Sequence, residues 1–224
     1  MTRKKKRMLM GTGRAILLAL FLLAVILPIY WMMSTSFKPN QEIINAQKLT
    51  YFPHTWTLEN YRMLFSMYNY SQMLGNSIII SLSTGLCVTL LSILGGYGLA
   101  RYEFRSKGAM LLFFLVTQMI PGILVIIPLY LIFAKAQMIN TRFSLFVYYL
   151  IVNLPFCVIT MRSFFERIPY ALEEAACVDG CTKRQCLFRI VLPVMFSGIV
   201  AVFVFAFICV WNELIAGTIF ISTS

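Results

Sequence analysis

Charged residues are scarce in this sequence: they make up 12% of its 224 residues, whereas hydrophobic residues make up 60%. Soluble globular domains carry about 25% charged residues, so this composition excludes an ordinary water-soluble protein and indicates a membrane protein. The net charge of +11 does not indicate nucleic-acid binding, because the basic residues flank apolar segments and do not form one patch interleaved with aromatic residues.

Ionisable side chains are missing from the long apolar runs, which contain no Asp, Glu, Lys, Arg or His. Proton- or sodium-coupled carriers and voltage sensors keep such groups within the membrane. An intramembrane protease or glycosyltransferase would need a buried Ser/His or Asp pair, or an acidic metal site. The motif GxxxxGK[ST] is also absent, so the chain does not bind ATP through a P-loop. Together these absences predict a membrane protein that is not an enzyme and that receives its energy from a separate chain.

The six cysteines do not predict a metal site. Cys177 and Cys181 are four residues apart, but Gly180 interrupts a helix between them and no histidine lies nearby. Reduced cytosolic thiols are the better interpretation, and we expect neither a metal nor another cofactor. The single histidine, His54, falls in a polar loop, where we expect it to be solvated.

Five apolar runs are long enough to cross a bilayer as helices. The first is too long for the core of a signal peptide and shows no small-residue cleavage pattern, so we expect it to be retained. The second contains many small residues, which allow close helix contact in lipid. We therefore predict an all-α, polytopic membrane helical bundle with spans at 15–37, 73–100, 109–134, 143–161 and 194–212.

The basic residues predict the orientation of these spans. External segments would hold only Lys38, Lys48, Arg62, Lys135 and Arg142 of the 19 basic residues, and cytoplasmic segments would hold the rest. This bias favours a cytoplasmic N-terminus, with residues 1–14 as a basic cytoplasmic segment. It also places residues 169–193 in the cytoplasm.

Three polar side chains within the spans are candidates for lining a transport pathway: Asn76, Gln118 and Asn153. The alternative is that they form hydrogen bonds between helices, which is the commoner role of small polar residues in spans, or bond a carbonyl group that a break has freed. Pro121 and Gly122 follow Gln118 near the middle of the third run, where they predict a kink or a locally opened backbone.

Residues 169–193 are too polar to span a bilayer and too long for a plain loop. Pro169 suits the first position of a helix. Glu173 and Glu174 follow near the N-terminus of that helix, where carboxylates are favourable. Two consecutive alanines would leave a shallow face that a partner protein can approach closely, so we predict a docking helix.

The same stretch predicts a second short helix. Asp179-Gly180 is typical of a helix end, because glycine tolerates the left-handed conformation found there. Thr182-x-x-Gln185 has the form of a capping box, and Pro193 can open the next apolar run. The two helices would thus join the fourth span to the fifth.

The pattern Glu174-Ala175-Ala176, three residues, Gly180, nine residues, Ile190-x-Leu192-Pro193 resembles the EAA loop of bacterial ABC-importer permeases; the alternative is an ordinary amphipathic loop helix. In that family the loop is the coupling helix, which sits in a cleft of the ATP-binding subunit. The resemblance implies that Glu174 anchors the helix and that Gly180 sets the turn. It gives the ATPase-coupling residues as Glu174, Ala175, Ala176, Asp179, Gly180, Ile190, Leu192 and Pro193.

The Gln118-Met119-Ile120-Pro121 segment and Trp211-Asn212-Glu213 resemble the carbohydrate branch of that family. The resemblance implies a multi-pass permease subunit of a maltose-type, binding-protein-dependent sugar importer in the bacterial cell membrane. Its partners would be an ATP-binding subunit dimer, a second permease subunit and an extracytoplasmic sugar-binding protein.

Two alternatives stay open at this point. One is a permease of the same superfamily for a non-sugar solute. The other is a truncated, non-transporting copy, because the family normally has six spans and residues 15–224 contain five, apparently ending before the last.

Overall fold

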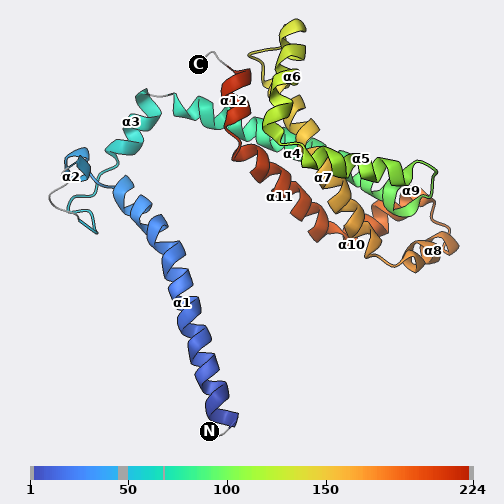
Figure 1. Ribbon diagram of the computed structural model, residues 1–224, viewed down its shortest axis with the longest axis horizontal. Coiled ribbons are helices and arrows are strands. Elements are labelled where there is room, and N and C mark those ends of the chain that lie inside the picture. Colours follow the sequence, from blue (N-terminus) through green and yellow to red (C-terminus); the bar gives the residue numbers. More distant parts are fainter. Residues whose placement is uncertain (1–2, 45–49, 68, 222–224) are drawn as a thin grey trace. The chain divides into compact units, whose positions relative to one another are not determined.

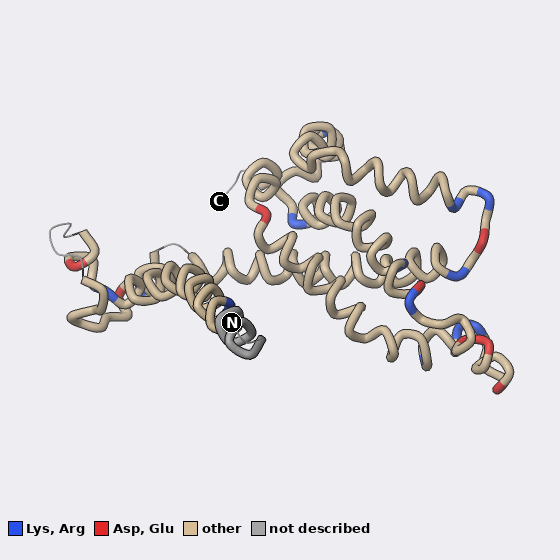
Figure 2. Tube along the Cα trace, turned by 60° about the horizontal axis from the view of Figure 1, so that its bottom comes forward, with Lys and Arg blue, Asp and Glu red and all other residues tan. Residues whose placement is uncertain are grey.

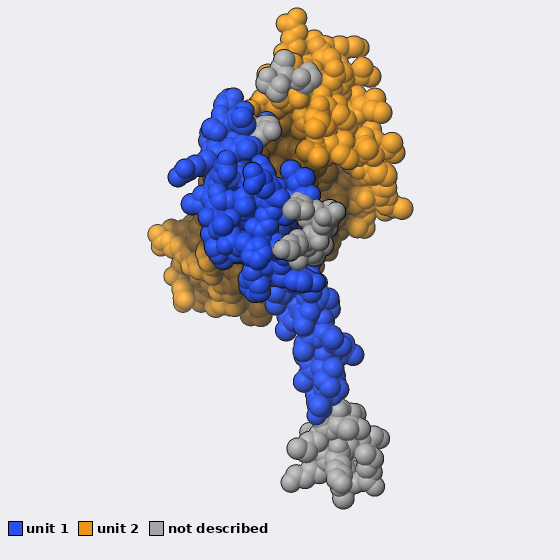
Figure 3. Space-filling view, turned by 90° about the vertical axis from the view of Figure 1, so that its left-hand side faces the viewer, with its two compact units in different colours: residues 1–73 blue, residues 74–224 orange. Residues whose placement is uncertain are grey.

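The computed structural model describes residues 3–44, 50–67 and 69–221, and their regular secondary structure is entirely helical. This confirms the predicted all-α class. The chain divides into two compact units, Met1–Met73 and Leu74–Ser224 (Figure 3). The predicted basic segment 1–14 begins with residues that lie outside the described part, as does Lys48 of the external set.

The first unit consists of one long helix and a loop that folds onto its end. The long helix is followed by a polar loop with two short helices. These elements are α1 (Arg3–Ser36), α2 (Asn40–Ile44) and α3 (Glu59–Met67).

Lys38 organises this loop. Its side chain is buried, donates from Nζ to the carbonyl oxygen of Thr50 and lies over the ring of Trp31. Glu42 accepts hydrogen bonds from Thr50 Oγ1 at 2.6 Å and from the backbone N–H of His54 at 3.3 Å. The side chain of His54 is exposed. Its backbone N–H holds the loop together through the hydrogen bond to Glu42.

The hydrogen bond from Thr50, and with it the one from His54, lowers the pKa of Glu42 below its ordinary value of 4.5, against a smaller opposing effect of burial. The carboxylate therefore stabilises the loop above that pH, and this stabilisation is lost as the pH falls below it. We expect amide hydrogen exchange in residues 50–58, corrected for the intrinsic effect of pH, to be faster at pH 4 than at pH 6. A Glu42→Gln variant should show no such difference, and an equal difference in both proteins would contradict the assignment.

The second unit is a bundle built on α4 (Tyr70–Arg101), which starts just before the unit boundary. Charged residues gather near the ends of its helices and leave the helical middle almost free of charge (Figure 2). In chain order the other elements are α5 (Lys107–Met119), α6 (Gly122–Lys135), α7 (Arg142–Glu166), α8 (Tyr170–Val178), α9 (Lys183–Cys186), the π-helical segment Leu187–Val191, α10 (Leu192–Val194), α11 (Phe196–Trp211) and α12 (Ile215–Phe220) (Figure 1).

Three described helices are long and apolar enough to cross a membrane: α1 from Gly11, α4 and α7. The number rises to five if two bent pairs each form one span. The first pair, α5 and α6, bends by 97° at Ile120 and Pro121, as the Pro-Gly sequence predicts. The second pair bends by 76° before Phe196. Three to five candidate spans agree with a polytopic bundle, while the five exact ranges stay a prediction.

Glycine allows α4 and α7 to pack closely. A Cβ added at Gly96 would lie 2.8 Å from the backbone nitrogen of Arg162 and 2.9 Å from Cβ of Met161. A Cβ added at Gly85 of α4 would likewise lie 3.2 Å from the ring of Phe203 in α11. These contacts bring α4, α7 and α11 together, as the small residues of the second span predict.

The buried side chains form two separate core clusters, and α4, α7 and α11 contribute to both. The first core cluster also includes residues of α8, α9 and the π-helical segment, and the second includes residues of α6 and α12. The first consists of Val88, Tyr97, Cys157, Met161, Phe165, Ile168, Ala176, Cys186, Leu187, Val191, Met195, Val202 and Ala206. The second consists of Ile80, Ile126, Phe133, Leu145, Tyr148, Tyr149, Val210, Ala216 and Phe220.

Candidate docking helix

The first predicted helix of the polar stretch is α8. It begins at Tyr170, so Pro169 lies just before the helix and not in its first turn as expected. At the other end the N–H of Cys181 donates to the carbonyl of Ala176, and the N–H of Gly180 donates to that of Cys177. These two bonds form a Schellman motif, which leaves Gly180 left-handed at φ +89°.

The predicted capping box at the start of α9 is confirmed. The backbone N–H of Gln185 donates to Thr182 Oγ1 at 3.3 Å, and that of Thr182 donates to Gln185 Oε1 at 2.9 Å. The two caps fix the turn between α8 and α9 at both of its sides. The turn therefore has a defined shape although Asp179 and Gly180 are exposed.

The structure divides the eight predicted coupling residues into two groups. Ala176 is buried, and Ile190 and Leu192 pack against the same first core cluster. Ala176 therefore holds α8 to the bundle, and the prediction of an open face built from both alanines was wrong for this residue. The residues left exposed, where a partner could contact them, are Glu174, Ala175, Asp179, Gly180 and Pro193.

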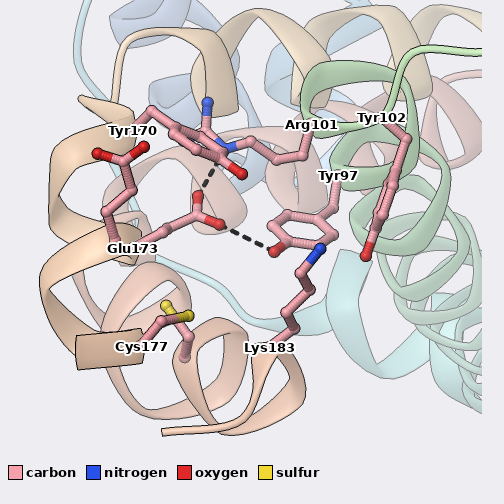
Figure 4. Close-up of a pocket in the computed structure, with 9 residues that line it drawn as sticks. Tyr97, Arg101, Tyr102, Tyr170, Glu173, Cys177 and Lys183 are labelled. Carbon is pink, nitrogen blue, oxygen red and sulfur yellow. Dashed lines mark hydrogen bonds and ion pairs between the residues drawn. The ribbon is translucent and has the colours of Figure 1, made fainter. Parts of the chain in front are cut away.

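Glu173, and not Glu174, is the carboxylate that the fold buries. Its Oε1 accepts from Nε of Arg101 at 2.5 Å, and its Oε2 accepts from the hydroxyl of Tyr97 at 2.9 Å. Figure 4 shows the Glu173 side chain reaching from α8 toward both residues at the end of α4. A second nitrogen of Arg101, Nη2, donates to the carbonyl of Ile168, just before α8.

A cavity of about 250 Å³ lies beside this ion pair. Its lining includes Tyr102, Lys183, Cys177 and the exposed Glu174. The ammonium group of Lys183 lies 5.6 Å from the centre of the Tyr102 ring, a distance at which a cation and an aromatic ring attract each other. This hollow at the polar end of the bundle carries charges of both signs.

Pro193 accounts for the π-helical segment that precedes it in the chain. Proline has no N–H and its ring crowds the carbonyl one turn earlier, so a regular α-helix is disfavoured there. The chain responds with a wider turn, in which the N–H of Leu192 donates to the carbonyl of Leu187. Leu187 and Val191 are buried by this arrangement, so the segment fixes how the docking region joins α11.

The three candidate pathway residues lie in different surroundings. Asn153 donates from its side chain to the carbonyl of Tyr149, one turn earlier in its own helix, at 2.8 Å. Gln118 is exposed at the bend between α5 and α6, and Asn76 is half-buried in α4. No hydrogen bond joins any two of them within the described residues, so their role in a pathway stays a prediction.

Glu213 of the Trp-Asn-Glu element stabilises the start of α12. Its carboxylate accepts from the N–H of Ala216 at 3.0 Å and from the hydroxyl of Tyr149 in α7 at 2.9 Å. The element thus connects the end of α11 to both α7 and α12. Sequence reasoning singled out these residues by resemblance and did not foresee this contact.

The fold and this site define a class of protein: an all-helical, multi-pass membrane protein that carries a short, partly exposed helix at the polar end of its bundle. A family model described as "Binding-protein-dependent transport system inner membrane component" matches residues 89–224. The chain belongs to this family, and it is a permease subunit of an ABC importer.

Similar proteins agree with this assignment. The Inner membrane ABC transporter permease protein YcjP of Escherichia coli (strain K12) is 34% identical over 221 residues, which cover 98% of this chain and 79% of the relative. The Diacetylchitobiose uptake system permease protein DasC of Streptomyces coelicolor is 32% identical, over 86% of this chain and 69% of its own length. The Trehalose transport system permease protein SugB of Mycobacterium tuberculosis is 33% identical, over 85% and 68%.

A solved structure has the same fold. It is described as the crystal structure of a bacterial ABC transporter involved in the import of the acidic polysaccharide alginate. The match has a TM-score of 0.78 at 20% sequence identity, and it covers 99% of this chain and 80% of the solved chain.

Proposed function

We propose that this chain forms part of the path by which a sugar crosses the bacterial cell membrane, and that a separate ATPase drives the movement by docking on α8. Relatives named for diacetylchitobiose and trehalose uptake support a sugar over another solute. The observation that carries the docking site is that Glu174, Ala175, Asp179 and Gly180 are exposed together on one capped helix. Within α8, Glu173 and Ala176 are the buried residues that hold the helix to the bundle.

The proposed assembly contains an ATP-binding subunit dimer, this chain with a second permease subunit, and an extracytoplasmic sugar-binding protein. The N-terminus and α8 lie in the cytoplasm, as the basic residues favour. Glu174 makes a charged contact with the ATPase, and Gly180 sets the turn that presents it. Asn76, Gln118 and Asn153 are our candidates for polar contacts along the pathway.

Reversing the charge of Glu174 tests the docking site. In proteoliposomes that hold the complete complex, a Glu174→Lys variant should lose sugar-stimulated ATP hydrolysis and should retain less ATPase on purification. The expected loss is about tenfold or more, because removing one partner of a charge pair that is buried in an interface costs about 2–5 kcal/mol.

A Glu103→Lys variant is the matched control for Glu174→Lys. Glu103 is also an exposed carboxylate of the second unit, and it forms a surface ion pair with Lys107, which is worth little. Hydrolysis should stay near the wild-type rate in this control. Wild-type hydrolysis in Glu174→Lys would refute the docking site, and stimulation by an amino acid instead of any sugar would refute the substrate class.

A further inference from the structure

We infer that Tyr97, Arg101 and Glu173 form a linkage that makes α8 and the end of α4 move as one body. The inference rests on the proposed function, in which an ATPase moves α8, and it adds a route by which that movement enters the bundle. We call these three residues the α4–α8 linkage. It differs from the docking surface, because its three side chains are almost fully buried within the protein.

The α4–α8 linkage joins the helices at three points. Glu173 accepts from Arg101 Nε at 2.5 Å and from the Tyr97 hydroxyl at 2.9 Å, so both carboxylate oxygens are used. Arg101 also donates to the carbonyl of Ile168 at 3.0 Å, and its guanidinium lies 5.7 Å from the ring centre of Tyr170. One arginine therefore contacts the segment before α8 and two residues in the first turn of α8, Tyr170 and Glu173.

Burial makes this linkage stiff. The side chains of Arg101 and Glu173 are each 8% exposed, so water does not readily replace either partner. Charge-assisted hydrogen bonds are stronger than neutral ones, and separating a buried pair leaves both charges without a partner. By contrast, the pair of Lys107 with Glu103 has a carboxylate that is 88% exposed and opens at little cost.

The residues of α4 beside the linkage are themselves held against α7. The ring of Tyr97 packs edge-on against Phe165, with ring centres 5.3 Å apart, and Phe165 is fully buried. Gly96, the preceding residue, lies close to the backbone of α7, since a Cβ added there would be 2.8 Å from the backbone nitrogen of Arg162. The contacts between α8 and α4 are therefore buried and closely packed, so a displacement of α8 should displace α4 as well.

This arrangement changes which helices receive the movement. Along the chain, α8 is joined only to α7 and α9, so covalent connection alone would pass the movement to α7 and α11. The linkage adds α4, a helix that continues without a break from Arg101 to Tyr70. If the ion pair of Arg101 with Glu173 only stabilised the fold, α8 could shift relative to α4 during the ATP cycle. If the pair couples the two helices, the distance between them stays constant.

The distance between α8 and the segment after α4 provides the test. Spin labels would be introduced as non-canonical amino acids at Val178 and Ser106, both exposed, which leaves the six native cysteines in place. Double electron–electron resonance would compare the complete complex without nucleotide and with a non-hydrolysable ATP analogue. We expect the same narrow distance distribution in both states. A shift of the wild-type distance between the states would overturn the inference.

Removing the linkage should uncouple the two helices. An Arg101→Met/Glu173→Met variant deletes both charges together and avoids leaving one buried alone. We expect the ATPase to co-purify with it at the wild-type ratio, the distance distribution to broaden or to differ between states, and sugar uptake to fall by about tenfold, since a coupling free energy of 1–3 kcal/mol corresponds to factors of this size.

An Arg105→Met variant is the matched control, because it removes an exposed arginine of the same end and should leave distance and uptake unchanged. Unchanged uptake together with unchanged distances in the double variant would overturn the inference. If the double variant does not assemble, the wild-type distance measurement still decides. Failure of the ATPase to bind the wild-type chain at all would instead refute the proposed function, so the two failures are distinguishable.

Discussion

Replacing Gly180 with proline should reduce ATP hydrolysis to its unstimulated rate in the assembled complex. Gly180 has φ +89°, whereas proline fixes φ near −65°. Proline also lacks the N–H that Gly180 donates to the carbonyl of Cys177 at 3.1 Å. The Schellman motif would be lost and the angle between α8 and α9 would change. The exposed face of α8 would then no longer be oriented for the ATPase. The measurement is sugar-stimulated hydrolysis in proteoliposomes.

Two milder substitutions separate backbone geometry from side-chain size. A Cβ added at Gly180 meets no atom within 4 Å, so space does not limit this position. Gly180→Asn should therefore keep most of the stimulation, because asparagine visits the left-handed region readily. Gly180→Val should lose more, because a β-branched residue there is a genuine outlier. Equal activity of the valine and asparagine variants would show that the left-handed turn is not required.

Replacing Gly96 with leucine should prevent the bundle from assembling. Even the Cβ of alanine would lie 2.8 Å from the Arg162 backbone nitrogen, and backbone cannot move aside as a flexible side chain does. Overpacking typically costs about 1–3 kcal/mol. We expect Gly96→Ala to fall in that range and Gly96→Leu to exceed it. Thermal unfolding of the purified chain in detergent, and the yield of complex with its partners, would measure the effect.

Gly98 offers a matched control two residues further along α4. A Cβ there meets nothing within 4 Å, so Gly98→Ala should leave the unfolding temperature unchanged or raise it, because alanine loses less conformational entropy than glycine in a helix by about 0.5–1 kcal/mol. If Gly96→Ala were as stable as Gly98→Ala, the close contact between α4 and α7 would not stabilise the bundle.

The local features of the docking region could be predicted because each depends on neighbours in the sequence. The end of α8 at Gly180 and the capping box of Thr182 with Gln185 follow from backbone preferences within a few residues. The break after Gln118 follows from Pro121 in the same way. Long apolar runs likewise predict helices regardless of what they pack against.

The contacts that select one helix face over another could not be predicted. Glu173 and Glu174 are adjacent and chemically identical, and their different burial depends on Arg101, which lies 72 residues earlier. Helical spacing places Glu173 on the same face as Ala176, which is a signal for a shared buried side, but the resemblance directs attention to Glu174. The π-helical segment is similarly invisible in the sequence, since Pro193 predicts only a disturbance of the helix.

The two core clusters have a mechanical consequence. Three helices, α4, α7 and α11, contribute buried residues to both clusters and are therefore held at two places along their length. A helix that packs in both clusters can carry a tilt from one cluster to the other. Under the proposed function, a movement of α8 is therefore expected to reach the second cluster, which includes residues of α12.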